Sequence, residues 1–243
     1  FMKVIILAAG NASRLALLAN GSPKCLLPLG NTTILGKQLH NLEKVGLTDV
    51  ILSVGYKVEK VEEYLKNFRT NLKIHLEFNP FYDISNNIVS LWNVRHLVWN
   101  QPIIIINGDN VFDYQILSLL LESPFENVLM IQEKDEYDGD DMKVKTENDR
   151  LKAINKTMKS SEANGESIGI MKFSAEGCAQ LMQKIVEMTR NKENLQVWYL
   201  RSIQELINDG LPVHVCRING LKWEEVDFPE DYLRVKNMNW EGN

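Results

Sequence analysis

Apolar runs of strand length alternate with amphipathic helical segments over about the first 130 of the 243 residues. The apolar runs cover residues 3–8, 49–54, 73–78, 102–107 and 127–134, and the helical segments between them cover residues 32–46, 58–68, 86–98 and 113–123. Continuous apolar runs are typical of buried parallel strands, and apolar residues three and four apart are typical of helices. The alternation predicts an α/β fold, doubly wound and Rossmann-like, with a mostly parallel sheet.

The pattern changes in the second half of the chain. The later elements are expected as a β-hairpin at residues 142–156, a strand at 166–174, helices at about 174–190 and 197–209, and a last helix from Pro229. The hairpin is expected to turn near Asn148 and Asp149. No stretch rich in proline, glycine or serine divides the chain, so we predict a single domain over residues 2–243, with the hairpin as an insertion.

The loop after the first apolar run, residues 9–24, combines small residues with two cations. It lacks both the Gly-Lys-Ser/Thr ending of a P-loop and the three spaced glycines of a dinucleotide loop. It still offers backbone N–H groups from Ala9 to Ser13 and the side chains of Arg14 and Lys24, which together suit a chain of phosphates. An ordinary surface loop with basic residues is the alternative interpretation.

Two carboxylates are expected at the ends of apolar strands, where ligands bind in open parallel sheets. Asp109 follows the run "PIIIING", in which Gly108 would let another group approach the backbone closely, and Asp227 ends the segment "WEEVD". Mg²⁺ prefers one or two carboxylates together with phosphate oxygens and water. The two residues therefore predict a magnesium site beside the phosphates, unless Asp109 is only a turn residue and Asp227 only a helix cap.

Composition excludes several other classes of function. The net charge is −5 and the basic residues form no stripe, which argues against a nucleic-acid partner. No apolar run is long enough to cross a membrane, no signal-peptide pattern is present, and the three cysteines lack paired or metal-like spacing. We therefore expect a cytoplasmic protein without a membrane partner.

The segments "LAAGNASRL" and "SPKCLLPLGNTTIL" closely resemble the signature of nucleotidyltransferases of the sugar-nucleotide pyrophosphorylase type. "VGY", "NGD" and "WEEVDFPEDY" follow at the spacings that this family uses. "NPFYDISNNIVSLW" and "GDDMKV" are similar to the middle segments of its small cytidylyltransferases, which activate phosphocholine, phosphonates and related compounds. One departure is Ala12, which stands where the family has its second loop glycine.

The resemblance implies a CTP-dependent transfer of CMP to a small phosphorylated acceptor, with Mg²⁺ as cofactor. It places the nucleotide in about residues 2–132 and the acceptor in about 133–243. Lys24 and Arg14 would be the catalytic cations, and Asp109 and Asp227 the metal ligands. The nucleotide would contact Leu7, Ala8, Ala9, Gly10, Asn11, Ala12, Ser13, Asn86, Asn87, Ser90 and Gly108. The attacking oxygen is already anionic near neutral pH, so none of the four histidines is given a role.

The acceptor is expected near Asp141, Lys143, Trp198, Tyr199 and Arg201. The acidic run around Asp141 is also typical of a solvated loop, and the aromatic pair could either recognise a cation or cap the core. Choline-type relatives are expected to carry acidic residues just after this pair, whereas this chain has Leu200, Arg201 and Ser202. A guanidinium suits a carboxylate, so we favour a phosphorylated amino acid such as phosphoglutamine over phosphocholine as the acceptor. Such an acceptor would serve the synthesis of capsule phosphoramidate or of another cell-surface polysaccharide.

Two other functions stay open at this point. One is a pyrophosphorylase that makes UDP- or dTDP-sugars, although the hexapeptide repeats common in those enzymes are absent. The other is a non-catalytic homologue that binds a nucleotide and regulates a partner, against which the retention of both cations and both carboxylates argues. The sequence leaves the oligomeric state open, with a homodimer as one candidate.

Overall fold

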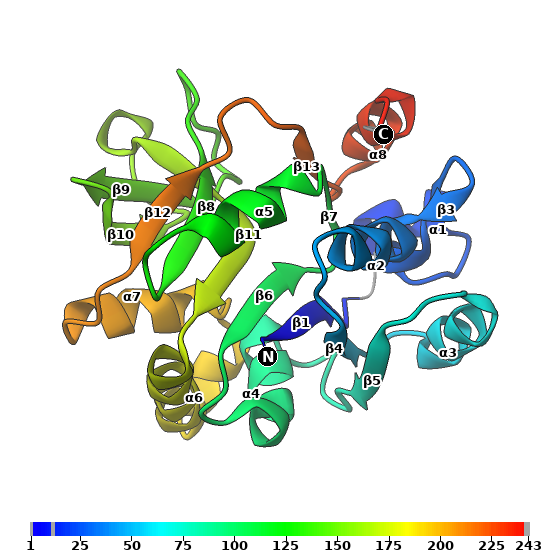
Figure 1. The fold of residues 1–243 in the computed structure, drawn as a ribbon, viewed down its shortest axis with the longest axis horizontal. Coiled ribbons are helices and arrows are strands. Elements are labelled where there is room, and N and C mark those ends of the chain that lie inside the picture. Colours follow the sequence, from blue (N-terminus) through cyan, green and yellow to red (C-terminus); the bar gives the residue numbers. More distant parts are fainter. Residues whose placement is uncertain (1, 11–12, 241–243) are drawn as a thin grey trace.

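One mixed sheet of nine strands runs through the part of the chain that the computed structural model describes, residues 2–10 and 13–240 (Figure 1). In spatial order its strands are β5 (Lys73–Phe78), β4 (Asp49–Val54), β1 (Lys3–Ala8), β6 (Ile103–Asn107), β11 (Gly165–Phe173), β8 (Val128–Gln132), β12 (His214–Arg217), β10 (Arg150–Asn155) and β9 (Lys143–Glu147). Two small antiparallel pairs accompany it, β2 (Pro28–Leu29) with β3 (Thr32–Thr33), and β7 (Asn110–Phe112) with β13 (Trp223–Glu225).

The helices agree closely with the segments expected from periodicity, except for one short helix, α1, in the N-terminal loop, which was not predicted. They are α1 (Ala16–Ala19), α2 (Ile34–Lys44), α3 (Val58–Asn67), α4 (Asn87–Val98), α5 (Gln115–Glu122), α6 (Ala175–Thr189), α7 (Leu200–Asn208) and α8 (Pro229–Asn237). Thr33 caps α2, because its hydroxyl accepts a hydrogen bond from the Gly36 N–H at 3.0 Å. None of the helices in the described ranges combines the length and the apolar character needed to span a bilayer.

The parallel pairing predicted from the β-α alternation holds for β5, β4, β1 and β6. The sheet becomes mixed at β11, which runs antiparallel to both β6 and β8, while β12 pairs parallel with β8. The predicted hairpin is present as β9 and β10, and Asn148 and Asp149 at its turn both have positive φ, as a type I′ hairpin turn requires. The α/β fold is therefore confirmed, with antiparallel strands where the β-α alternation stops.

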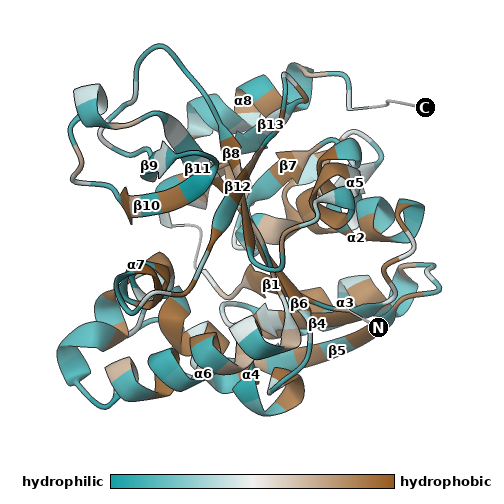
Figure 2. Cartoon of the chain, turned by 60° about the vertical axis from the view of Figure 1, so that its left-hand side comes forward, coloured by the Kyte–Doolittle hydropathy of each residue, from teal (hydrophilic) through white to brown (hydrophobic). Residues whose placement is uncertain are grey.

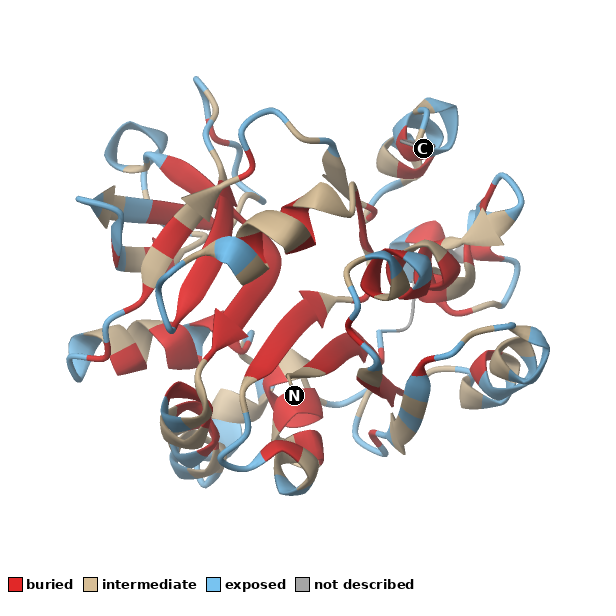
Figure 3. Ribbon diagram, viewed as in Figure 1, coloured by how far each residue is buried: buried red, intermediate tan, exposed pale blue. Residues whose placement is uncertain are grey.

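Both faces of the central sheet are buried, as a doubly wound fold requires. Ile5 and Leu7 belong to an apolar cluster with residues of α4, α6 and α7, whereas Val4 and Ile6 belong to one with residues of α2, α3 and α5. Figure 2 shows apolar strands inside and polar helix surfaces outside, and Figure 3 shows the same strands as the most buried part of the chain.

The strand ends that carry the expected site lie against one another. The Gly108 N–H donates to the Leu7 carbonyl at 2.9 Å, and a Cβ at Gly108 would lie only 2.6 Å from that oxygen and 2.8 Å from Ala8 Cα. The close approach expected at Gly108 is therefore to the chain's own first strand. It brings the start of the N-terminal loop next to Asp109.

Candidate active site

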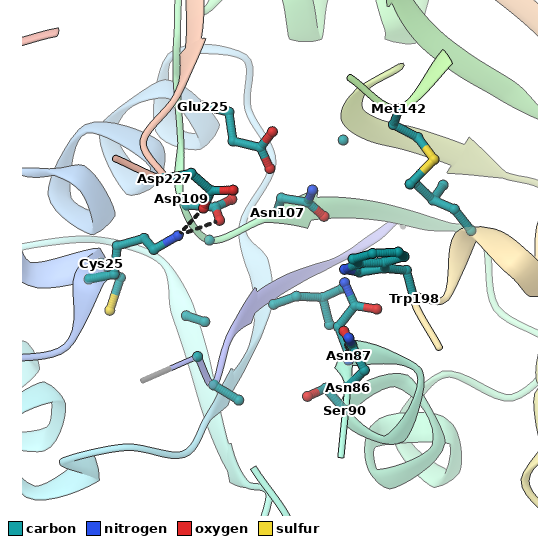
Figure 4. A pocket seen from close by; sticks show the side chains of 18 of the residues that line it. Cys25, Asn86, Asn87, Ser90, Asn107, Asp109, Met142, Trp198, Glu225 and Asp227 are labelled. Atoms are coloured by element: carbon teal, nitrogen blue, oxygen red, sulfur yellow. Dashed lines mark hydrogen bonds and ion pairs between the residues drawn. The ribbon is translucent and has the colours of Figure 1, made fainter. Parts of the chain in front are cut away.

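Three carboxylates from two distant segments converge at the end of β6. β7 and β13 pair antiparallel with Glu225 opposite Asn110, and the Val226 N–H donates to the Asp109 carbonyl at 3.0 Å. This register brings oxygens of Asp109, Glu225 and Asp227 within 4.8 Å of one another. Figure 4 shows the three side chains on one side of a pocket.

Two cations from the N-terminal loop face these carboxylates. Lys24 Nζ lies 3.0 Å from Asp109 Oδ2 and 2.5 Å from Asp227 Oδ1, contacts that are dashed in Figure 4. Arg14 Nη1 lies 3.5 Å from Asp227 Oδ2. The structure thus brings together the four residues that the sequence singled out from three separate segments.

Burial and charge act in opposite directions on these groups. Burial alone would lower the pKa of Lys24, but Asp109 and Asp227 outweigh it and raise that pKa above its usual range. Burial likewise opposes ionisation of Asp227, yet Lys24 and Arg14 hold the pKa of Asp227 below its ordinary value. Burial, together with the two neighbouring aspartates, raises the pKa of Glu225 to about 8.

The donor set fits a divalent cation. All three groups offer carboxylate oxygens, the ligands that Mg²⁺ prefers. Asp109 Oδ1 is buried and has no hydrogen-bond partner among the described residues, which is a costly arrangement unless a cation or a substrate group contacts it. Glu225 was not predicted from the sequence, although it lies two residues before Asp227 and side chains two apart share one face of a strand.

A cavity of about 420 Å³ opens beside the carboxylates. Most of the expected nucleotide contacts line it, namely Leu7, Ala8, Ala9, Gly10, Asn86, Asn87, Ser90 and Gly108. Ser13, at the start of a short 3₁₀ turn (Ser13–Leu15), is not among its lining residues. Asn11 and Ala12 lie outside the described residues.

Polar side chains at the start of α4 form the far wall, opposite the carboxylates (Figure 4). Asn86 caps the helix by accepting from the Asn87 N–H at 2.8 Å, and Asn87 Oδ1 accepts from the Tyr199 N–H at 2.7 Å. Ser90 Oγ accepts from Asn79 Nδ2 at 3.2 Å. These contacts fix the orientation of the wall and tie it to the start of α7.

Of the five expected acceptor contacts, Trp198 lines the cavity. Lys156 lies over its ring, with Nζ 4.7 Å from the ring centroid, and also lines the cavity. Sequence reasoning missed Lys156, although it ends the predicted hairpin and so follows a strand. Its backbone carbonyl accepts from Lys143 Nζ at 2.9 Å, so Lys143 is buried behind the wall and supports Lys156.

Tyr199 and Arg201 do not line the cavity, because successive residues at the start of α7 point in different directions. Trp198 points into the cavity, whereas Tyr199 is fully buried in the core. The Arg201 side chain is 63% exposed and pairs with Glu205 one turn along the helix at 2.9 Å. The sequence-based reason for an acceptor carboxylate, which rested on Arg201, therefore has no support from its position.

Arg201→Ala is accordingly expected to change little. An exposed pair between residues four apart on a helix is worth about 0.3–0.5 kcal/mol, so the unfolding free energy should fall by no more than that. The Michaelis constants for nucleotide and acceptor should stay within about twofold of those of the parent protein. Steady-state kinetics and urea unfolding measure both quantities. A large rise in the acceptor KM alone would return Arg201 to the site.

Asp141 belongs to a partly buried ion-pair cluster with Lys134 and Glu166. Lys134 Nζ lies 2.7 Å from Asp141 Oδ2 and 2.6 Å from Glu166 Oε2. The cluster fixes the loop that presents Asp140 and Met142 to the cavity, so the acidic run is not simply a solvated loop. Burial and the neighbouring Asp141 raise the pKa of Glu166 from an ordinary value of 4.5 to about 7, against the effect of Lys134.

Glu166→Gln should flatten the dependence of stability on pH. Because the pKa of Glu166 is raised, the folded state binds a proton that the unfolded state has released between about pH 4.5 and 7. The unfolding free energy of the parent protein should fall as the pH rises through this range, by about 2 kcal/mol more than that of the variant. Urea unfolding at pH 5 and pH 8 measures the difference. The exposed Glu162→Gln is the control, and equal slopes in parent and Glu166→Gln would contradict the prediction.

Several known proteins are similar in sequence to this chain. Choline-phosphate cytidylyltransferase from Streptococcus pneumoniae is 26% identical over 241 residues, covering 98% of each protein. CTP:phosphoglutamine cytidylyltransferase from Campylobacter jejuni is 23% identical, covering 95% of this chain and 97% of the relative. CMP-5'-(3-aminopropyl)phosphonate synthase from Streptomyces rubellomurinus is 33% identical over 123 residues, which are 51% of this chain but only 19% of that longer protein.

The fold is shared with solved structures. The structure of CTP:phosphocholine cytidylyltransferase from Streptococcus pneumoniae superposes with a TM-score of 0.79 and 23% identity, covering 97% of both chains. The family model of the MobA-like NTP transferase domain matches residues 4–162, well over half of the chain. The resemblance seen in the N-terminal signature is thereby confirmed, and the chain is a nucleotidyltransferase that belongs to the family with a MobA-like NTP transferase domain.

Proposed function

We propose that this chain transfers CMP from CTP to a small phosphorylated acceptor and releases pyrophosphate. The observation that carries the proposal is the contact of Lys24 with both Asp109 and Asp227 at the mouth of the N-terminal loop. Few functions other than the handling of a nucleotide triphosphate need a loop, two cations and three carboxylates in one place. Two relatives that match along nearly their whole length and that of this chain are cytidylyltransferases, which supports CTP as the nucleotide.

The cavity has an arrangement that suits a nucleotide. We assign the phosphates to the loop that begins at Gly10, beside Arg14 and Lys24, and the cytosine to the wall of Asn86, Asn87 and Ser90. Cytosine presents an amino group and a carbonyl, so it needs an acceptor and a donor, which amide and hydroxyl side chains supply. Residues 2–132 would then bind CTP, and residues 133–243 would complete the acceptor side.

The carboxylates of Asp109, Asp227 and Glu225 would together hold Mg²⁺. When bound, the ion neutralises charge on the phosphate oxygens. Two cationic side chains of the protein would supply further positive charge. Lys24 places positive charge where charge develops on the phosphoryl oxygens, and Arg14 is positioned to hold the departing pyrophosphate.

The reaction needs no general base. An acceptor phosphate oxygen, already anionic, forms a bond to the α-phosphorus while the bond from that phosphorus to the bridging oxygen breaks, and pyrophosphate leaves with the electron pair. Protein groups contribute mainly by alignment and charge. The fully buried, apolar surroundings of β1 and β6 fix the strand ends that carry these groups.

We assign the acceptor to the side of the cavity that contains Trp198 and Lys156. The ammonium of Lys156 over the ring favours an acceptor that brings negative charge there, such as its phosphate or a carboxylate. This supports a phosphorylated amino acid as the first candidate. The exposed face of Trp198 supports phosphocholine as the second, since aromatic rings bind quaternary ammonium groups.

Pyrophosphate release from CTP, UTP, dTTP and GTP, each tested with phosphoglutamine, phosphocholine, aminoalkylphosphonates and glucose 1-phosphate, tests the proposal. Release that requires CTP together with a phosphorylated head group is the expected result. A preference for UTP or dTTP with the sugar phosphate would identify a sugar pyrophosphorylase instead. Nucleotide binding without turnover for any pair would indicate a regulatory homologue. A cytoplasmic location, a role in capsule or cell-surface polysaccharide synthesis, and a homodimer stay predictions.

A further inference from the structure

Gln38 is a buried amide in the middle of the apolar face of α2. It is fully buried, and it lies four residues after Ile34 and one before Leu39, which are both fully buried apolar residues. A leucine would fit the helical pattern at this position equally well. Burying an amide costs free energy unless it is hydrogen-bonded, so its contacts indicate what it does.

Both amide hydrogens of Gln38 are donated to carbonyls of one backbone turn. Nε2 donates to the Asn107 carbonyl at 2.9 Å and to the Asn110 carbonyl at 2.7 Å. These two carbonyls bracket Gly108 and Asp109. Gln38 therefore bridges the end of β6 and the start of β7 across the residue that carries the proposed metal ligand.

The turn needs such a support. Asp109 lies in a dense group of charged side chains, with one carboxylate oxygen 3.0 Å from Lys24 Nζ and oxygens of Glu225 and Asp227 within 4.8 Å, so a small shift of the turn would change these contacts. β6 and β7 belong to different sheets, so no continuous ladder holds Asp109 between them. From the opposite side, Asn110 Nδ2 donates to the Ile168 carbonyl, so the turn is held by side-chain amides on both sides.

We propose that Gln38 is a positioning residue that fixes the Asn107–Asn110 turn so that the Asp109 carboxylate is held ready for a divalent cation. The inference rests on the proposed metal site. It assigns to α2, which does not line the cavity, a part in metal affinity. Partners that orient metal ligands in this way typically change metal affinity or activity by about 10- to 100-fold when they are replaced.

The same helix offers a matched control. Asn41, one turn further along α2, is also buried, and its Nδ2 donates to the Phe112 carbonyl at 2.7 Å. This contact supports β7 three residues beyond Asp109. Gln38→Met and Asn41→Leu each remove buried hydrogen bonds while keeping the volume similar, so both should destabilise the fold. Only the first should loosen Asp109.

Binding of Mn²⁺ in the presence of CTP, followed by electron paramagnetic resonance, separates the two roles without relying on turnover. Gln38→Met should weaken Mn²⁺ binding by about 10- to 100-fold, while Asn41→Leu should change it by less than about twofold. Gln38→Asn, whose amide is one methylene shorter, gives the same expected loss if the methionine variant does not fold. Weakening by the same factor in both helix variants would overturn the positioning role.

The variant Asp109→Asn separates a failure of the proposed metal site from a failure of the proposed role of Gln38. If Asp109→Asn loses Mn²⁺ and Gln38→Met does not, the inference about Gln38 is wrong and the metal site stands. If Asp109→Asn binds Mn²⁺ as the parent protein does, both the metal site and the role of Gln38 are overturned. Loss in Asp109→Asn and Gln38→Met, with Asn41→Leu unaffected, supports both.

Discussion

Lys24→Ala is expected to lower kcat by about 10²-fold or more while the fold stays intact. Lys24 Nζ contacts Asp109 and Asp227 and lines the cavity, so the variant loses the ammonium placed beside the proposed metal ligands and phosphates. The two carboxylates raise the pKa of Lys24 above its usual range, which favours the charged form of the side chain. Pre-steady-state and steady-state pyrophosphate release with CTP measure the loss.

Lys60→Ala controls for disturbance of the loop. Lys60 Nζ donates to Ser22 Oγ at 3.3 Å, two residues before Lys24, but Lys60 does not line the cavity. This variant should keep kcat within about twofold. Lys24→Arg should recover part of the lost rate, because the charge is kept in a different shape. Near-normal turnover in purified, folded Lys24→Ala would remove Lys24 from the mechanism.

The elements of the fold could be predicted because they follow from local pattern. Val4 and Ile6 on one face and Ile5 and Leu7 on the other make β1 a run that is apolar at every position, which only a sheet covered on both faces explains. The direction of β11 could not be predicted in the same way. Its pairing with β6 is decided by the path of the chain between them, and apolar runs of parallel and antiparallel strands look alike once both faces are buried.

The residues of the site could likewise be predicted only in part from the sequence. Asp109 and Asp227 could be proposed because each follows a strand, and the structure places them in contact with Lys24. Glu225 and Lys156 were missed because the available signals, spacing from Asp227 and a place at the end of a strand, show only that a side chain could face the site. Strand register and the path of the hairpin decide that it does. Arg201 was assigned from its place after an aromatic pair. Leu200, the first residue of α7, lines the cavity, and at 100° per residue the next position, Arg201, is turned away from it.

Gln38 shows a signal that the sequence does contain. A single amide on an otherwise apolar helix face is costly, so it indicates a specific buried partner. The partner itself cannot be named from the sequence, because the Asn107–Asn110 turn lies about 70 residues further along the chain. A single polar residue in an otherwise apolar helix face therefore indicates a specific buried contact of this kind.

Asp109→Asn and Asp227→Asn are each expected to reduce Mg²⁺-dependent pyrophosphate release by about 10²-fold or more, and the double variant should lose little beyond either single one. Their oxygens lie in one cluster with those of Glu225, so removal of one ligand already spoils the site that the other would share. Titration of Mg²⁺ in each variant, with EDTA-treated parent protein as the reference for the metal-free rate, measures the effect.

Asp113→Asn is the matched control for this prediction. Asp113 lies four residues after Asp109 and accepts from the Lys222 N–H at 3.1 Å, so it also links the β7 segment to the segment before β13. It does not line the cavity, and its variant should keep both the rate and the Mg²⁺ dependence. If the losses in the Asp109 and Asp227 variants instead multiply in the double variant, the two carboxylates act independently. In that case Lys24 would contact two carboxylates that have separate roles and do not share one metal ion.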